Sequence, residues 1–206
     1  MGRKKKGLCT KWVETINISQ QKSQVSEISL DMHRVSFSIN PGSFPNISLN
    51  DYAIIIATGT GIAPFRNLLF ERFNSARFLK YEGSVCLFYG CRNKTDDFLY
   101  GDEFQMFKNC SNMNFDYNVA FSRDQKEKIY VQHLIKEKWE FIYDIVFVKR
   151  CYVFIVGNSK VLPKSIDNAL KHVFCQKNKD MEKLDEEWNK ILYALKKSGR
   201  FYIETW

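Results

Sequence analysis

The sequence has no long hydrophobic run. Among its 206 residues, no apolar stretch approaches the ~20 residues that a membrane-spanning helix needs. The basic start at 1–6, Met-Gly-Arg-Lys-Lys-Lys, is not followed by the apolar stretch of a signal peptide. These absences predict a soluble, cytoplasmic protein with no membrane segment in this chain.

The sequence also lacks the patterns of a metal site and of a disulfide framework. Its six cysteines include no C-x-x-C pair, and its three histidines lie far apart from one another. Several cysteines lie inside apolar, strand-like runs, where cysteine acts as a small hydrophobic residue. Reduced thiols and no bound metal are therefore expected.

Composition indicates an ordinary globular chain. Hydrophobic residues make up 45% of it, and its length is sufficient to bury a core without disulfides. The formal net charge of +8 suits an anionic partner, but the basic residues are spread along the chain and form no stripe. A nucleic-acid-binding domain is a minor alternative that rests only on this charge and on the basic start, so no nucleic-acid partner is expected.

From residue 51 onward, strand-like and helix-like patterns take turns. Short apolar runs that predict strands and amphipathic stretches that predict helices follow one another along the chain. The strands are expected at 53–57, 85–89, 117–121, 152–156 and 201–203, and the helices at 64–73, 103–108, 131–144, 163–174 and 181–195. This alternation predicts an α/β domain with a doubly wound, five-stranded, mostly parallel sheet that binds ligands beyond the carboxyl ends of its strands.

The first 50 residues have a different pattern. Residues 28–40 largely alternate between apolar and polar, and turn residues follow at 41–46. We interpret 1–49 as the tail of a separate β domain and 50–206 as the α/β domain. Because 49 residues are too few for a whole β domain of this kind, a fragment or a truncated gene product is expected.

A glycine-containing turn lies between the first predicted strand and its helix. Residues 57–64 read Ala-Thr-Gly-Thr-Gly-Ile-Ala-Pro. Glycines let a backbone approach a ligand closely, and the start of a helix presents free amides to a pyrophosphate. The segment matches neither the G-x-G-x-x-G fingerprint nor a P-loop, so a plain structural turn is an equal alternative.

A polar cluster follows the third predicted strand. Ser122, Arg123, Lys128 and Tyr130 supply a hydroxyl, a guanidinium, an ammonium and a phenol within a few residues. This combination suits a compact dianion such as the 2′-phosphate of NADPH, because arginine binds it with a fork of donors and lysine adds a point charge. The alternative is a solvated charged loop before a helix.

Taken together, three segments resemble the NADP-binding part of the diflavin reductases. They are 58–66, 88–92 with 97–100, and 120–123 with 128–133, and they occur in the family's order. The resemblance implies a ferredoxin-reductase-type NADP-binding domain, preceded by the tail of an FAD-binding β-barrel. Within the family, 157–163 and 200–206 look most like the branch that feeds cytosolic iron–sulfur assembly, and a P450-reductase-type enzyme is the alternative.

The resemblance also implies roles for individual residues. Thr60 would meet the NADP phosphates, and Ser122, Arg123 and Lys128 would hold the 2′-phosphate. Tyr130 and Gln132, with Ile129 and Val131 beside them, would complete the adenosine site. Ser165 falls where the family often has an aspartate near the nucleotide. Gly7, Leu8, Cys9 and Thr10 resemble the family's turn that binds the FAD pyrophosphate.

Two residues at the end of the chain resemble the family's catalytic residues. Trp206 corresponds to the terminal aromatic that stacks on the flavin and moves aside for nicotinamide, and Glu204 to the acidic residue beside it. The alternative is a terminal tryptophan that packs on the surface. Val156 stands where the P450 reductases carry a cysteine, so no catalytic cysteine is expected.

The implied activity is transfer of hydride from NADPH to FAD. Electrons would then pass through FMN, on a domain absent from this chain, to a protein acceptor of cytosolic iron–sulfur assembly. Because most of the FAD barrel would be missing, this chain is expected to bind NADPH, to hold FAD weakly or not at all, and to be inactive alone. An isolated nucleotide-binding module without turnover is the remaining alternative.

Overall fold

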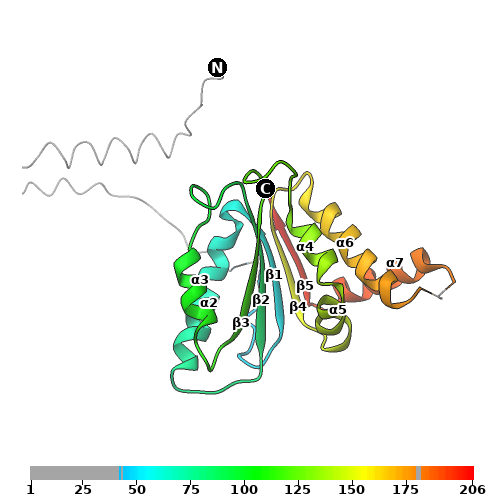
Figure 1. Cartoon of the computed structure of the whole chain (residues 1–206). Coiled ribbons are helices and arrows are strands. Elements are labelled where there is room, and N and C mark those ends of the chain that lie inside the picture. Colours follow the sequence, from blue (N-terminus) through cyan, green and yellow to red (C-terminus); the bar gives the residue numbers. More distant parts are fainter. Residues whose placement is uncertain (1–41, 43, 180–181) are drawn as a thin grey trace, which may run out of the picture. The chain divides into compact units, whose positions relative to one another are not determined.

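A single parallel sheet organises the part of the chain that the computed structural model describes, namely residues 42, 44–179 and 182–206. Its strands are β1 (Ala53–Thr58), β2 (Ser84–Cys91), β3 (Asn114–Phe121), β4 (Tyr152–Gly157) and β5 (Phe201–Thr205). All neighbours pair in parallel, in the order β3-β2-β1-β4-β5 (Figure 1). The predicted doubly wound, five-stranded parallel sheet is confirmed.

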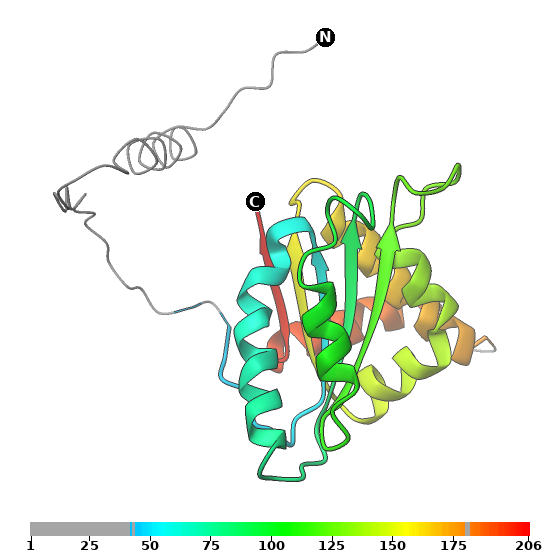
Figure 2. The same ribbon diagram turned by 60° about the vertical axis from the view of Figure 1, so that its left-hand side comes forward.

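Helices cover both faces of this sheet (Figure 2). One face carries α2 (Ala63–Ala76) and α3 (Gly101–Lys108). The other carries α4 (Val131–Glu137), α5 (Trp139–Tyr143), α6 (Leu162–Lys177) and α7 (Leu184–Lys197). The central strand β1 is buried on both faces, which explains why its sequence is a continuous apolar run.

Each face has its own apolar core. Phe65 and Leu69 of α2 and Phe104 of α3 pack on one side of the sheet. Ile135 of α4, with Ile166 and Leu170 of α6, packs on the other side. These two cores hold the strand ends in fixed positions, as a site built on those ends requires.

The stretch 131–144 differs from the prediction of one continuous amphipathic element. It is divided at Lys138, whose φ of −92° and ψ of 32° lie outside the helical region, and α5 continues into a π-helical turn over Asp144–Val148. No glycine or proline marks the division, so the sequence pattern has no sign of it. The expected helix at 181–195 begins at Leu184, and Met181 lies outside the described residues.

A segment before β1 is fastened to the same unit. Phe44 and Leu49 pack against the core under α2. The buried Arg72 of α2 donates hydrogen bonds to the carbonyls of Ser48 (2.6 Å), Leu49 (3.0 Å) and Asp51 (3.3 Å). This clamp fixes the path of the chain as it enters β1.

The remaining expectations concern membrane-spanning helices, metal sites and the first residues of the chain. None of the helices in the described part of the chain combines the length and the apolar character that crossing a bilayer takes. The described residues also contain no cluster of three side chains arranged to hold a metal ion. Most of the predicted β-domain tail, residues 1–41, lies outside the described residues, and so do Gly7, Leu8, Cys9 and Thr10.

Candidate functional site

A cleft of about 930 Å³ opens at the carboxyl ends of the strands. The strand order reverses direction between β1 and β4, and doubly wound sheets bind their ligands at such a switch point. Every strand contributes to the lining, through Thr58 and Thr60 at β1, Gly90, Cys91 and Arg92 at β2, Ala120 and Ser122 at β3, Asn158 at β4 and Trp206 at β5. The topology therefore brings together residues that are far apart in the sequence.

The turn after β1 is shaped by two glycines. Gly59 has a φ of +56°, a left-handed conformation that favours glycine. A Cβ on Gly61 would lie 2.7 Å from the carbonyl oxygen of Val156, so the turn packs against the neighbouring strand β4. A single 3₁₀ turn, Gly59–Ile62, leads into α2, and Thr60 lines the cleft between the two glycines.

The end of β4 is as tightly packed as the turn after β1. Gly157 has a φ of +148°, and a Cβ there would collide with the hydroxyl oxygen of Thr58. The backbone of Trp206 is tied to this strand end, because its N–H donates to Gly157 (3.2 Å) and its carbonyl accepts from the N–H of Ser159 (3.0 Å). Trp206 remains 59% exposed at the cleft, so its backbone is fixed by hydrogen bonds while its side chain is not buried in the core.

The loop after β3 is pinned by hydrogen bonds where it begins. Ser122 donates to the carbonyl of Cys91 from its N–H (2.9 Å) and its hydroxyl (3.2 Å), and Arg123 N–H donates to the carbonyl of Arg92 (2.9 Å). The Asp124 carboxylate accepts hydrogen bonds from Asn93 Nδ2 and from a backbone N–H, both at 2.9 Å. From Arg123 to Tyr130 every side chain is exposed.

Some of the predicted site residues line the cleft and others do not. Those in the lining are Thr60, Ser122, Tyr130, Val131, Gln132, Ser165 and Trp206. Arg123, Lys128 and Ile129 lie on the exposed loop after β3 and are absent from the lining, and Glu204 is exposed on β5, where it pairs with Val156. Their roles remain predictions.

Five further polar residues line the cleft, although none was among the predicted site residues. They are Thr58, Arg92, Asp96, Asp97 and Asn158. Arg92 and Asp97 belong to segments that resemble the diflavin reductases, and Asn158 directly follows β4. Arg92 and Asn158 lie directly after β2 and β4, and this position was the available sequence signal for them. To choose among the residues that follow strands, one must also know the strand order.

Among the residues that the structure describes, Cys91 is the cysteine that lines the cleft, and its surroundings disfavour the reactive thiolate. Burial, with a smaller contribution from the carboxylates of Asp97 and Asp124, raises the pKa of Cys91 to about 11. A thiol with this pKa is protonated at neutral pH, whereas the thiolate is the reactive form. Cys91 therefore acts as a packing residue of the cleft wall.

A second cavity, of about 490 Å³, lies near the amino ends of β2 and β3. Ser84 and Asn114, at the starts of these strands, line it together with residues 137–141. It receives no residue from β1, β4 or β5 and none of the predicted site residues. The larger cleft at the carboxyl ends is therefore the candidate site.

Comparison with known proteins identifies related sequences. The family model of the oxidoreductase NAD-binding domain matches residues 55–165, more than half of the chain. The chain is similar to NADPH-dependent diflavin oxidoreductase 1 of Danio rerio (34% identity over 98% of this chain and 31% of the relative) and of Xenopus laevis (36%, over 98% and 30%). It is 26% identical to the NADPH–cytochrome P450 reductase of Cavia porcellus over 100% of this chain and 29% of that protein. The chain thus spans about a third of the length of the curated relatives it matches.

Proposed function

Since this chain belongs to the oxidoreductase NAD-binding domain family, we propose that its cleft binds NADPH as part of a diflavin oxidoreductase. One observation carries the proposal. The cleft lies at the switch point of the sheet, and Thr60, Ser122 and Tyr130 reach it from three different segments. The names of the relatives, which are NADPH-dependent oxidoreductases, agree with it.

The proposed nucleotide-binding residues divide into two groups. Thr60, on the turn after β1, would bind the pyrophosphate. Ser122, Arg123 and Lys128 would bind the 2′-phosphate, because a hydroxyl, a guanidinium fork and an ammonium together suit a compact dianion. Tyr130, with Ile129, Val131 and Gln132, would contact the adenosine, and Ser165 of α6 would face the nucleotide from the opposite wall.

At the other end of the cleft, Trp206 would act at the flavin. FAD supplies the hydride acceptor when it is bound. The backbone of Trp206 is held by one hydrogen bond to Gly157 at the end of β4 and one to Ser159 just beyond it, so only a side-chain rotation would be needed to uncover the place that nicotinamide takes. Glu204 is close by in the sequence and would stabilise the nicotinamide cation or hold a proton.

For the whole protein, we propose an electron path from NADPH through FAD and FMN to a protein acceptor. Segments 157–163 and 200–206 favour the branch that serves cytosolic iron–sulfur assembly, and hence a cytoplasmic protein. A P450-reductase-type enzyme is the second candidate, supported by the likeness to the Cavia porcellus protein. In this proposal, 1–49 belong to an FAD-binding domain, with Gly7 to Thr10 at the FAD pyrophosphate, and 50–206 bind NADPH.

Affinity chromatography tests the nucleotide proposal. The chain is applied to immobilised 2′,5′-ADP, which presents the adenosine and the 2′-phosphate alone. We expect retention and elution by free NADP⁺, with no elution by the same concentration of NAD⁺ at constant ionic strength. A chain that passes through the column, or that NAD⁺ elutes equally well, would contradict a site for the 2′-phosphate.

A further inference from the structure

Tyr130 occupies an unusual position in the cleft wall. It is the last residue of the exposed loop and immediately precedes α4, and its side chain is 41% exposed while lining the cleft. Its neighbour Val131 is fixed in the core, but the Tyr130 ring has no comparable burial. The orientation of the Tyr130 ring must therefore depend on contacts outside the core.

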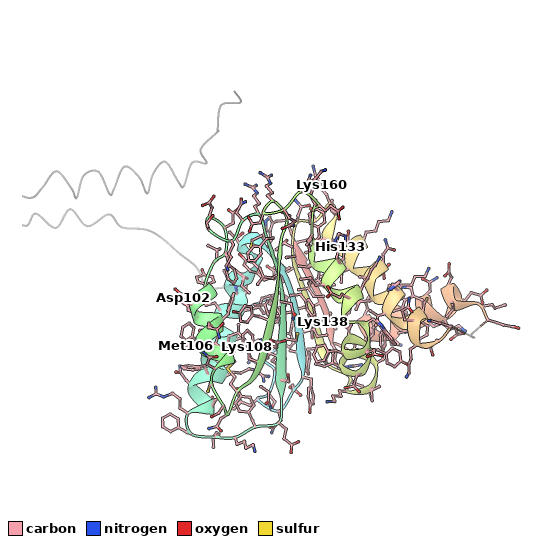
Figure 3. All side chains as sticks on the ribbon, viewed as in Figure 1. Asp102, Met106, Lys108, His133, Lys138 and Lys160 are labelled. Atoms are coloured by element: carbon pink, nitrogen blue, oxygen red, sulfur yellow. The ribbon has the colours of Figure 1, made fainter. Side chains whose placement is uncertain are left out.

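His133 supplies the contacts that hold Tyr130. The N–H of Tyr130 donates to Nδ1 of His133 at 3.4 Å, and the N–H of His133 donates to the carbonyl of Tyr130 at 2.9 Å. The two rings also meet edge to face, with centroids 5.7 Å apart and planes at 66°. Figure 3 shows His133 on α4 near the cleft end of the sheet. Among the described residues, His133 is the aromatic partner of Tyr130.

The chemistry of this position favours histidine. The third residue of a helix commonly accepts a hydrogen bond from the N–H of the capping residue, and glutamate or glutamine usually does so. A glutamate here would place a negative charge beside a cleft proposed to bind an anionic nucleotide. Neutral imidazole accepts the same bond without that charge, and its ring adds the contact with Tyr130.

We propose that His133 is a positioning residue that orients Tyr130 for the adenosine of the bound nucleotide. This inference rests on the proposed function, because it concerns the residue that preorganises the adenosine part of the proposed nucleotide site. His133 is absent from the cleft lining, so it acts through Tyr130 and not by touching the ligand. The geometry also assigns the tautomer: Nδ1 is the acceptor, so the ring proton lies on Nε2.

The first test needs no ligand. Nitrogen-15 NMR of the full chain at alkaline pH, where imidazole is generally neutral, distinguishes the two tautomers of His133. We expect the Nε2–H tautomer in the wild type, and a shift of the Tyr130 amide signal in His133→Ala. A proton on Nδ1 overturns the proposal whether or not the chain binds nucleotide.

The second test measures NADP⁺ affinity of variants by titration. We expect His133→Ala to weaken binding by about tenfold, the scale of a lost helix cap, and His133→Gln to keep it within about twofold. His133→Glu keeps the acceptor but adds charge, so it should bind more weakly than His133→Gln. The unfolding temperature of each variant is recorded to identify general loss of structure.

A double-mutant cycle separates positioning from stability. If His133 acts through Tyr130, then Tyr130→Ala combined with His133→Ala binds NADP⁺ no more weakly than Tyr130→Ala alone. Full additivity of the two losses, or wild-type affinity in His133→Ala, overturns the positioning role. If the wild type itself fails to bind NADP⁺, the proposed function is what fails, and the tautomer measurement still decides the Tyr130–His133 contact.

Discussion

At the scale of single residues, the proposed function assigns the choice between NADPH and NADH to Arg123 and Lys128. Both are exposed on a loop whose first residues are pinned to β2. A cationic side chain on an exposed loop can bind a phosphate without first breaking contacts in the core. We therefore treat these two side chains as the ones whose removal should change cofactor preference without changing the fold.

The first prediction concerns Arg123→Ala. Hydrogen bonds to charged groups contribute about 1.5–3 kcal/mol, so NADP⁺ affinity should fall by roughly tenfold or more while NAD⁺ affinity is unchanged. Calorimetric titration with both nucleotides measures the difference. Lys126→Ala, which removes an exposed cation from the same loop, is the matched control and should change neither affinity. Equal loss for both nucleotides in Arg123→Ala would contradict the assignment.

The second prediction concerns the Cys91 thiol, whose pKa burial raises to about 11. Alkylation at neutral pH should be slow because little thiolate is present, and it should accelerate as pH rises. The pKa of a free cysteine is about 8.5, so the unfolded state loses this proton at a lower pH than the folded state does. The free energy of unfolding should therefore fall as pH rises from about 8.5 through the pKa of the folded state. Peptide-resolved mass spectrometry after alkylation measures the rate. Modification of Cys91 as fast as that of the partly exposed Cys110 would show that the thiol is activated.

At the scale of elements, the ends of neighbouring strands depend on one another. The tight approach of Gly157 to Thr58 joins β4 to β1 at the floor of the cleft. At the opposite end of β1, the Arg72 clamp joins α2 to the segment that enters the strand. A change at either contact should alter stability through the position of a whole strand.

Gly157→Ala is the third prediction. The φ of +148° strains any L side chain, and the added Cβ would collide with Thr58, so we expect a loss of at least about 2 kcal/mol in the free energy of unfolding. Urea denaturation measures it. Gly42→Ala is the control, since a Cβ there has open space around it. Wild-type stability in Gly157→Ala would mean that the strand ends are looser than described.

Arg72→Leu is the fourth prediction. The change removes three hydrogen bonds and leaves the carbonyls of Ser48, Leu49 and Asp51 without this donor, so unfolding free energy should fall by about 2–4 kcal/mol. The exposed Arg77, which directly follows the same helix, provides the control. Arg77→Ala should lower the free energy of unfolding by no more than about 0.5 kcal/mol. Similar stability for the two variants would argue against the clamp.

The sequence predicts the buried elements better than the edge elements. The apolar runs of β1 and β4 mark both strands closely because both faces of each are covered. The edge strand β3 begins at Asn114, three residues before the predicted start, because a polar residue such as Asp116 is tolerated where it reaches Lys108 at 2.6 Å. The division at Lys138 has no sequence signal of its own.

At the scale of the whole molecule, the sequence predicts which segments meet at the cleft but not which side chains face it. Thr60, Ser122 and Tyr130 line it, as the family resemblance implied for all three and the place after the third strand suggested for Ser122 and Tyr130. Arg123 and Glu204 do not, because neither the orientation of an exposed loop nor the pairing of β5 can be deduced from residue spacing. Arg92 and Asn158 were missed because their proximity depends on the strand order β2-β1-β4.

Titration calorimetry of this chain with NADP⁺ and then NAD⁺, at the same salt concentration, tests the central claim most directly. We predict that NADP⁺ binds in the micromolar range and NAD⁺ at least about tenfold more weakly, a difference of about 1.4 kcal/mol. This result would establish recognition of the 2′-phosphate. Equal affinity for the two nucleotides, or binding of neither by a chain that unfolds cooperatively, would contradict the NADPH site.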